Sequence, residues 1–130
     1  MRRISIAVLL LCAIPAFVLI RQCSKYPNLK ANRDALLQVY AQVSPGQSEA
    51  TFLQIVAAYQ QYLKLDQRVV SEYHTLWTAG TPSSWNAKNW QLYVDTVDSK
   101  VYRMRVRTRD SINEQPKGSP PDKLILPSVN

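Results

Sequence analysis

Four arginines at alternate positions are the side chains of this sequence whose type and spacing suggest a binding chemistry. They are Arg103, Arg105, Arg107 and Arg109. On a strand, residues two apart point to the same face, so the guanidinium groups would form one row. Such groups bind phosphates and carboxylates through paired hydrogen bonds. The row predicts a surface for anionic lipid, an anionic envelope polymer, nucleic acid or an acidic protein. The alternative is a solvated sheet face, partly neutralised by Asp95 and Asp110.

A second candidate surface is aromatic and precedes the arginines. It consists of Trp85, Trp90 and Tyr93. Aromatic side chains supply much of the binding energy of protein interfaces, so the group predicts a contact patch for a partner protein. Packing into the core is the alternative use of these rings. The residues between the arginines would face the core, so no aromatic platform for stacking bases accompanies the charges, and nucleic acid is the weakest of the ligands.

Residues suited to enzymatic or metal chemistry are few. The chain has one histidine, His74, and two cysteines, Cys12 and Cys23. A triad of His74 with Ser84 and a carboxylate is conceivable, but a lone histidine beside Tyr73 on a helix is more typical of packing or of the surface. One histidine without a cysteine cluster is no recognisable metal-ligand set. We therefore expect no enzymatic activity, no cofactor and no metal.

Length and charge bound the rest of the chain to one small domain. It has 130 residues, a net charge of +7 and 46% hydrophobic residues, which excludes a multidomain enzyme and a disordered tail. Residues 4–20 are uncharged, mostly apolar and bracketed by Arg3 and Arg21. They predict a transmembrane signal-anchor helix, since no small-residue cleavage site follows. A buried core helix is the alternative.

The flanking charges of that segment predict its orientation. The short N-terminal tail, residues 1–3, carries two arginines and resembles an export signal, whereas the basic residues after the segment favour the opposite orientation. We expect a single-pass protein of the inner membrane that contacts lipid through residues 4–20, with its C-terminal domain in the periplasm. Cys12 would lie in the bilayer, so Cys23 stays free or bridges a homodimer.

The elements that position the candidate residues follow a juxtamembrane linker at 21–29. Apolar spacing predicts one helix over 30–43 and a second from Ser48 to Trp77, with a break at 66–67. Between them, Pro45 and Gly46 supply a turn, and Ser44 or Ser48 can cap the second helix. A proline-rich extended tail at 115–130, with room for one edge strand, ends the chain.

Residues 89–109 predict an antiparallel hairpin, with strands 89–97 and 101–109 and a loop at 98–100. This register places one apolar face together: Trp90 with Thr108, Leu92 with Val106, Val94 with Met104 and Thr96 with Tyr102. The other face pairs Asp95 with Arg103 and Tyr93 with Arg105. We therefore expect an α+β domain over 30–114, with two helices packed on a small antiparallel sheet. An all-α fold is the alternative, because apolar residues of 89–109 also fit a heptad.

The turn Val43-Ser44-Pro45-Gly46-Gln47-Ser48-Glu49, followed by a helix and a Trp-led hairpin ending at Asp98-Ser99-Lys100-Val101, resembles the SmpA/OmlA and beta-lactamase-inhibitor-like modules. The lipobox of that family and its Leu-Gly-x-Pro after the helix are missing here. The resemblance implies a non-enzymatic role in protein contacts. The sequence thus predicts a membrane-anchored binding or assembly module of the bacterial cell envelope that acts through another envelope protein. The alternative is a cytoplasm-facing anchored basic domain that binds anionic lipid or nucleic acid.

Overall fold

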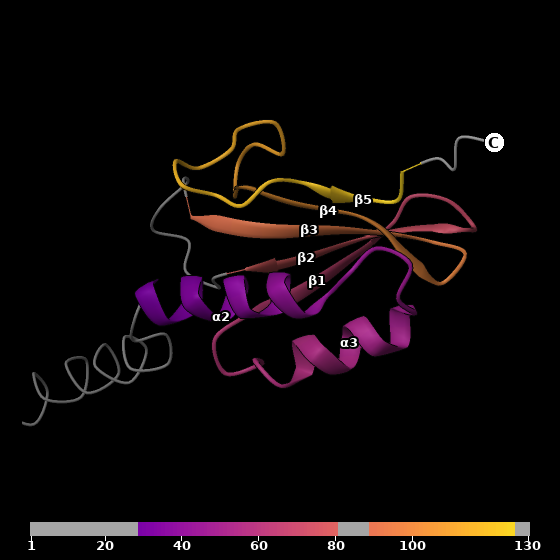
Figure 1. Ribbon diagram of the computed structural model, residues 1–130, viewed down its shortest axis with the longest axis horizontal. Coiled ribbons are helices and arrows are strands. Elements are labelled where there is room, and N and C mark those ends of the chain that lie inside the picture. The colour runs from indigo at the N-terminus through magenta and orange to yellow at the C-terminus, as the bar shows by residue number, and fades with distance from the viewer. Residues whose placement is uncertain (1–28, 81–88, 127–130) are drawn as a thin grey trace, which may run out of the picture.

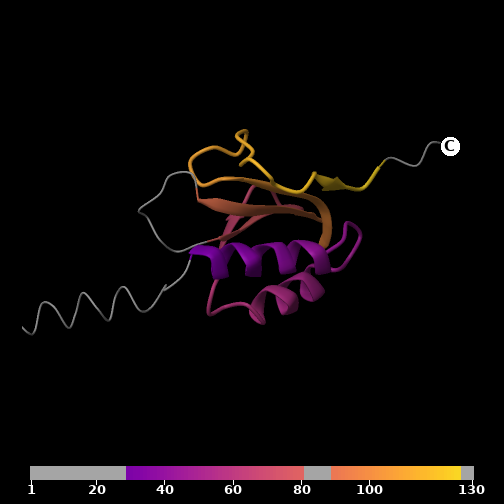
Figure 2. The same ribbon diagram turned by 60° about the vertical axis from the view of Figure 1, so that its left-hand side comes forward.

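The computed structural model describes residues 29–80 and 89–126, which form two helices and a five-stranded antiparallel sheet (Figure 1). In chain order the elements are α2 (Leu29–Gln42), α3 (Glu49–Ala57), β1 (Lys64–Val69), β2 (His74–Gly80), β3 (Trp90–Val97), β4 (Lys100–Thr108) and β5 (Lys123–Leu124). The strands lie in space in the order β1-β2-β3-β4-β5. Both helices lie on one side of the sheet (Figure 2).

The core lies between this side of the sheet and the helices. Apolar residues recur along α2 at helical spacing, so one stripe of the helix is buried. The buried apolar residues of α2 and the turn after it are Ala35, Leu36, Val39, Tyr40 and Val43. Helix α3 begins at a Ser48 cap, whose Oγ accepts a hydrogen bond from the Thr51 amide at 3.2 Å. It buries Phe52, whose ring meets Trp77 of β2 edge-on, with centroids 6.2 Å apart.

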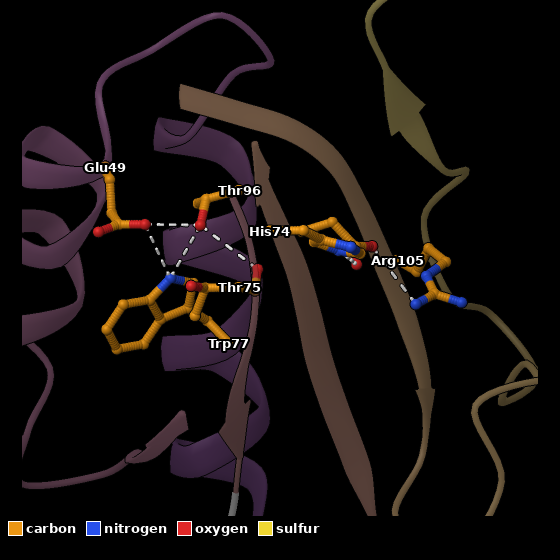
Figure 3. A network of polar contacts seen from close by, with 7 residues as sticks. Glu49, His74, Thr75, Trp77, Thr96 and Arg105 are labelled. Carbon is orange, nitrogen blue, oxygen red and sulfur yellow. Dashed lines mark hydrogen bonds and ion pairs between the residues drawn. The ribbon is translucent and has the colours of Figure 1, made fainter. Parts of the chain in front are cut away.

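A polar network fastens the start of α3 to the sheet. One Glu49 carboxylate oxygen accepts hydrogen bonds from Thr96 Oγ1 at 2.6 Å and from Trp77 Nε1 at 3.3 Å (Figure 3). The preceding turn bonds to the β3–β4 turn, since the Gly46 amide donates to the Val101 carbonyl at 2.7 Å. The turn, the helix and the hairpin therefore support one another, although they are far apart in sequence.

The central hairpin has the predicted register over most of its length. Leu92 pairs with Val106, Val94 with Met104 and Asp95 with Arg103. The prediction is wrong beyond Asp95, because a register shift between Asp95 and Thr96 pairs Thr96 with Val101. The loop is also shorter than predicted: Asp98 and Ser99 have φ angles of 50° and 61°, typical of a two-residue turn. Because of the register shift, the hairpin can have a two-residue turn and still place the apolar side chains of both strands on one face.

The predicted fold class is corrected by the extent of the sheet. The second helix ends at Ala57, and the residues expected to continue it form β1 and β2. The apolar stripe used for that prediction included Val69, Val70 and Tyr73, which are 68%, 53% and 64% exposed. These residues lie at the β1–β2 turn rather than in the core. With five strands in the described ranges, the all-α alternative is also wrong.

The predicted single-pass architecture is corrected as well. Within residues 29–80 and 89–126, no helix is long and apolar enough to cross a membrane. Residues 4–20, on which the transmembrane and signal-anchor prediction rested, lie outside the described residues. The N-terminal tail, most of the 21–29 linker, Cys12 and Cys23 lie outside them too.

Candidate protein-binding surface

Arg103, Arg105 and Arg107 lie on the sheet face opposite the helices. They point away from the core because Met104 and Val106, which alternate with them along β4, belong to it. One acidic residue on the same face contacts two neighbouring strands. Asp95 of β3 is 8% exposed. Its carboxylate lies 2.8 Å from His74 Nε2 of β2 and 3.4 Å from Arg105 Nη2 of β4 (Figure 3). These contacts hold the three strands together across the open face.

A second acidic residue pairs with the other two arginines. Asp122, just before β5, accepts a hydrogen bond from Arg107 at 3.0 Å, and its same oxygen lies 3.6 Å from Arg103. Asp95 and Asp110 were predicted to neutralise the row; in the structure the ion pairs come from Asp95 and Asp122. The arginine row is thus largely an internal ion-pair network, in which the tail is bound to the sheet. Arg109 lies beyond the end of β4, where its amide donates to the Asn89 carbonyl.

The predicted aromatic patch is divided between different places. Trp85 lies outside the described residues. Trp90 packs against the core on the helix side, where the Arg33 guanidinium lies 5.5 Å from the ring centroid. Tyr93 is buried on the opposite face, and its hydroxyl donates to the Thr108 carbonyl at 3.2 Å. Trp90 and Tyr93 therefore belong to opposite faces of β3 and form no common surface.

The buried Tyr93 predicts a loss of stability at alkaline pH. Burial raises the pKa of its hydroxyl above the usual 10.0, Arg105 opposes the shift, and Asp110 adds to it. Because the folded pKa is the higher one, this contribution to stability is complete below about pH 10 and is lost as pH rises through the folded pKa. We expect the free energy of unfolding to fall less steeply above pH 10 in Tyr93→Phe than in the unchanged chain. Denaturant titrations from pH 8 to 11 measure this, and equal slopes would contradict it.

A polar hollow lies at one end of the open face. Its volume is about 300 Å³, and its lining residues are Lys64, Asp66, Thr78, Gly80, Gln91, Tyr93 and Arg109. His74 lies outside it, bound to Asp95. In the part of the chain that the structure describes, no three histidine, cysteine or acidic residues are grouped as metal ligands. The hollow brings charges of both signs together, from Lys64, Asp66 and Arg109.

Among the described strands, β1 forms one edge of the sheet, an edge that was not predicted from the sequence. On its side away from β2, no strand of the described ranges pairs with it. The Val70 amide donates to the His74 carbonyl, and antiparallel ladders alternate between bonded and non-bonded pairs. Every second residue counted back from Val70 therefore bonds to β2. The residues between them, Leu65, Gln67 and Val69, direct their backbone N–H and C=O groups away from β2. We call these outward-facing groups the β1 edge.

The hairpin that carries the β1 edge is also apolar at its tip. Val69, Val70 and Tyr73 are all more than half exposed. The helices pack mainly on β2, β3 and β4, and of the apolar side chains of β1, Leu65 packs against the core. At the other side of the sheet, β5 has only two residues. The sequence gives little signal for β1, because Leu65 and Val69 are separated by three polar residues and are spaced as in a helix.

Comparison with known proteins leaves this surface to be interpreted from its own geometry. The resemblance to the SmpA/OmlA and beta-lactamase-inhibitor-like modules stays a prediction from short sequence patterns. No protein-family model matches the chain, and no curated protein or solved structure does so either.

Proposed function

We propose that this chain is a non-enzymatic protein-binding module whose β1 edge accepts a strand from a protein partner. The observation that carries the proposal is that one hairpin has both a strand edge with which no strand of the described residues pairs and exposed apolar side chains. In strand addition, backbone hydrogen bonds supply affinity and the flanking side chains supply specificity. An exposed strand edge offers backbone groups for pairing with another chain. The family resemblance supports the same class of function, contacts between proteins at the bacterial envelope.

Binding of anionic lipid or nucleic acid through the arginine row has less support. Arg105 is 11% exposed and lies beside Asp95, and Arg107 is 13% exposed and bonded to Asp122. A phosphate ligand would have to displace these carboxylates from the guanidinium groups. Arg103 is more open, at 42%, but it too faces Asp122. The row therefore contributes to the fold more readily than to a binding site.

Photo-crosslinking in cells that produce the full chain tests the proposal. A photoreactive phenylalanine analogue in place of Tyr73 should yield one discrete protein adduct, because this exposed ring lies in the turn that follows β1. The same analogue in place of Ile112 is the matched control. Ile112 is 44% exposed and lies after β4, away from the hairpin, so we expect no adduct from it.

A backbone variant shows whether the adduct depends on strand pairing. Gln67→Pro removes an outward N–H and leaves the amides of Asp66 and Arg68, which face β2, in place. We expect it to abolish the Tyr73 adduct, whereas Gln67→Thr, which keeps the N–H, retains it. Amide exchange of Asp66 and Arg68 verifies that β1 is still paired with β2. An adduct of equal strength from Ile112, or one that survives Gln67→Pro, would contradict the proposal.

A further inference from the structure

The side chains of β1 are complementary to a second copy of the same strand. On either side of Gln67, Asp66 and Arg68 carry opposite charges, and the next residues outward, Leu65 and Val69, are both apolar. In an antiparallel pair of identical strands centred on Gln67, Asp66 lies opposite Arg68 of the second copy. Leu65 lies opposite Val69 of the second copy. The two-fold symmetry produces each of these pairs twice.

The hydrogen-bonding pattern of the edge fits the same register. Leu65, Gln67 and Val69 carry the outward-facing backbone groups, and the register pairs Gln67 with Gln67 and Leu65 with Val69. Outward groups of one copy therefore meet outward groups of the other. Asp66 and Arg68 then form the non-hydrogen-bonded pairs, in which side chains approach most closely. Both carboxylate and guanidinium are accessible. The Asp66 side chain is 64% exposed and lies 3.6 Å from the exposed Lys64, and Arg68 is also exposed.

The charges disfavour the neighbouring registers. Centring the pair on Asp66 places two Asp66 carboxylates opposite each other and sets Lys64 against Arg68. Centring it on Arg68 places two guanidinium groups opposite each other. Like charges directly opposite on neighbouring strands are destabilising. If one strand moved along the other by a single residue, so that Gln67 lay opposite Asp66 or Arg68, outward backbone groups would meet inward ones. The hydrogen bonds of the ladder would then be lost. Among these registers, the one centred on Gln67 satisfies both the backbone and the charges.

We infer that the β1 edge binds the β1 edge of a second copy of this chain, antiparallel and centred on Gln67. This inference names the partner of the protein-binding edge and so rests on the proposed function. The pairing would join two five-stranded sheets into one continuous sheet and cover Val69, which is 68% exposed. A contact of one short strand per copy is small, so the association is reversible and depends on concentration.

Charge reversal tests both the partner and the register. Asp66→Arg places two arginines opposite each other, and Arg68→Asp places two aspartates opposite each other. In sedimentation velocity on the full chain, we expect each variant alone to self-associate at least about tenfold more weakly than the unchanged chain. An equimolar mixture of the two should associate again, because arginines of one copy then face aspartates of the other. Lys64→Gln is the matched control and leaves association unchanged, since Lys64 lies opposite Val70 of the second copy.

The outcomes separate this inference from the proposed function. The self-pairing is overturned if the chain without substitutions is monomeric at all concentrations. It is also overturned if the mixture of Asp66→Arg and Arg68→Asp does not associate. If the Tyr73 crosslink then joins a different protein and still depends on the Gln67 amide, only the self-pairing fails. If no Gln67-dependent crosslink forms, the protein-binding function fails as well. A crosslinked species of twice the chain mass, together with recovery in the mixture, supports both.

Discussion

Replacing Asp95 with alanine should lower the free energy of unfolding by about 3–5 kcal/mol. The Asp95 side chain is 12% exposed and is the acidic partner of Arg105, whose side chain is 11% exposed, and of His74. Alanine would leave a guanidinium group enclosed without its counter-charge. The loss is large beside the 5–15 kcal/mol by which domains are stable in total. Chemical denaturation monitored by tryptophan fluorescence measures it.

Two further variants distinguish the loss of the charge pair from general disruption. Arg105→Met in the Asp95→Ala background removes the unpaired charge while keeping an apolar side chain, so much of the lost stability should return. Lys64→Ala breaks an exposed pair with Asp66 instead, and surface pairs are worth about 0–1 kcal/mol. A double variant no more stable than Asp95→Ala would show that Asp95 acts other than by balancing Arg105.

Phe52→Ala should cost a similar amount, about 3–5 kcal/mol, for a different reason. Phe52 is completely buried between α3 and the sheet, where its ring meets Trp77 edge-on. Truncation removes that contact and leaves a cavity that the surrounding strands cannot close. Trp77 also donates to Glu49, so movement of its ring would loosen the start of α3. Thermal unfolding followed by near-ultraviolet circular dichroism reports both effects.

The matched control for Phe52 is an apolar residue outside the core. Leu126 is 75% exposed, and Leu126→Ala should change the free energy of unfolding by no more than about 0.5 kcal/mol. Phe52→Leu, which fills much of the space, should fall between the two. A loss below about 1 kcal/mol in Phe52→Ala would mean that α3 does not pack on the sheet as described.

The fold could be predicted from the sequence where one periodicity is stronger than the other. In β4 the strict alternation of arginines with Met104 and Val106 favoured a strand, although apolar residues of 89–109 also fit a heptad, and most of the β3–β4 register was predicted correctly. In residues 64–80 the apolar positions fit both periods. The choice between a helix and two strands depended on whether Val69, Val70 and Tyr73 are buried, and in the structure they are exposed. Burial is a property of the whole sheet, which a local pattern does not contain.

The site was harder to predict because its determinants are partners distant in sequence. The arginine row is visible in the sequence, but Asp122 pairs with it only because the tail returns to β4 as β5. Asp95 was paired with Arg103 by register, whereas its carboxylate lies beside Arg105 and His74. The β1 edge is defined by the absence of a neighbouring strand within the described ranges, and no pattern inside β1 encodes that.

The pairing of β1 with a second copy is tested most directly by residue-resolved amide exchange of the full chain over a series of concentrations. Leu65, Gln67 and Val69 should exchange rapidly when the chain is dilute and become protected together as the concentration rises. Asp66 and Arg68, which face β2, should be protected throughout. Free exchange of the three outward amides at every concentration would contradict the pairing.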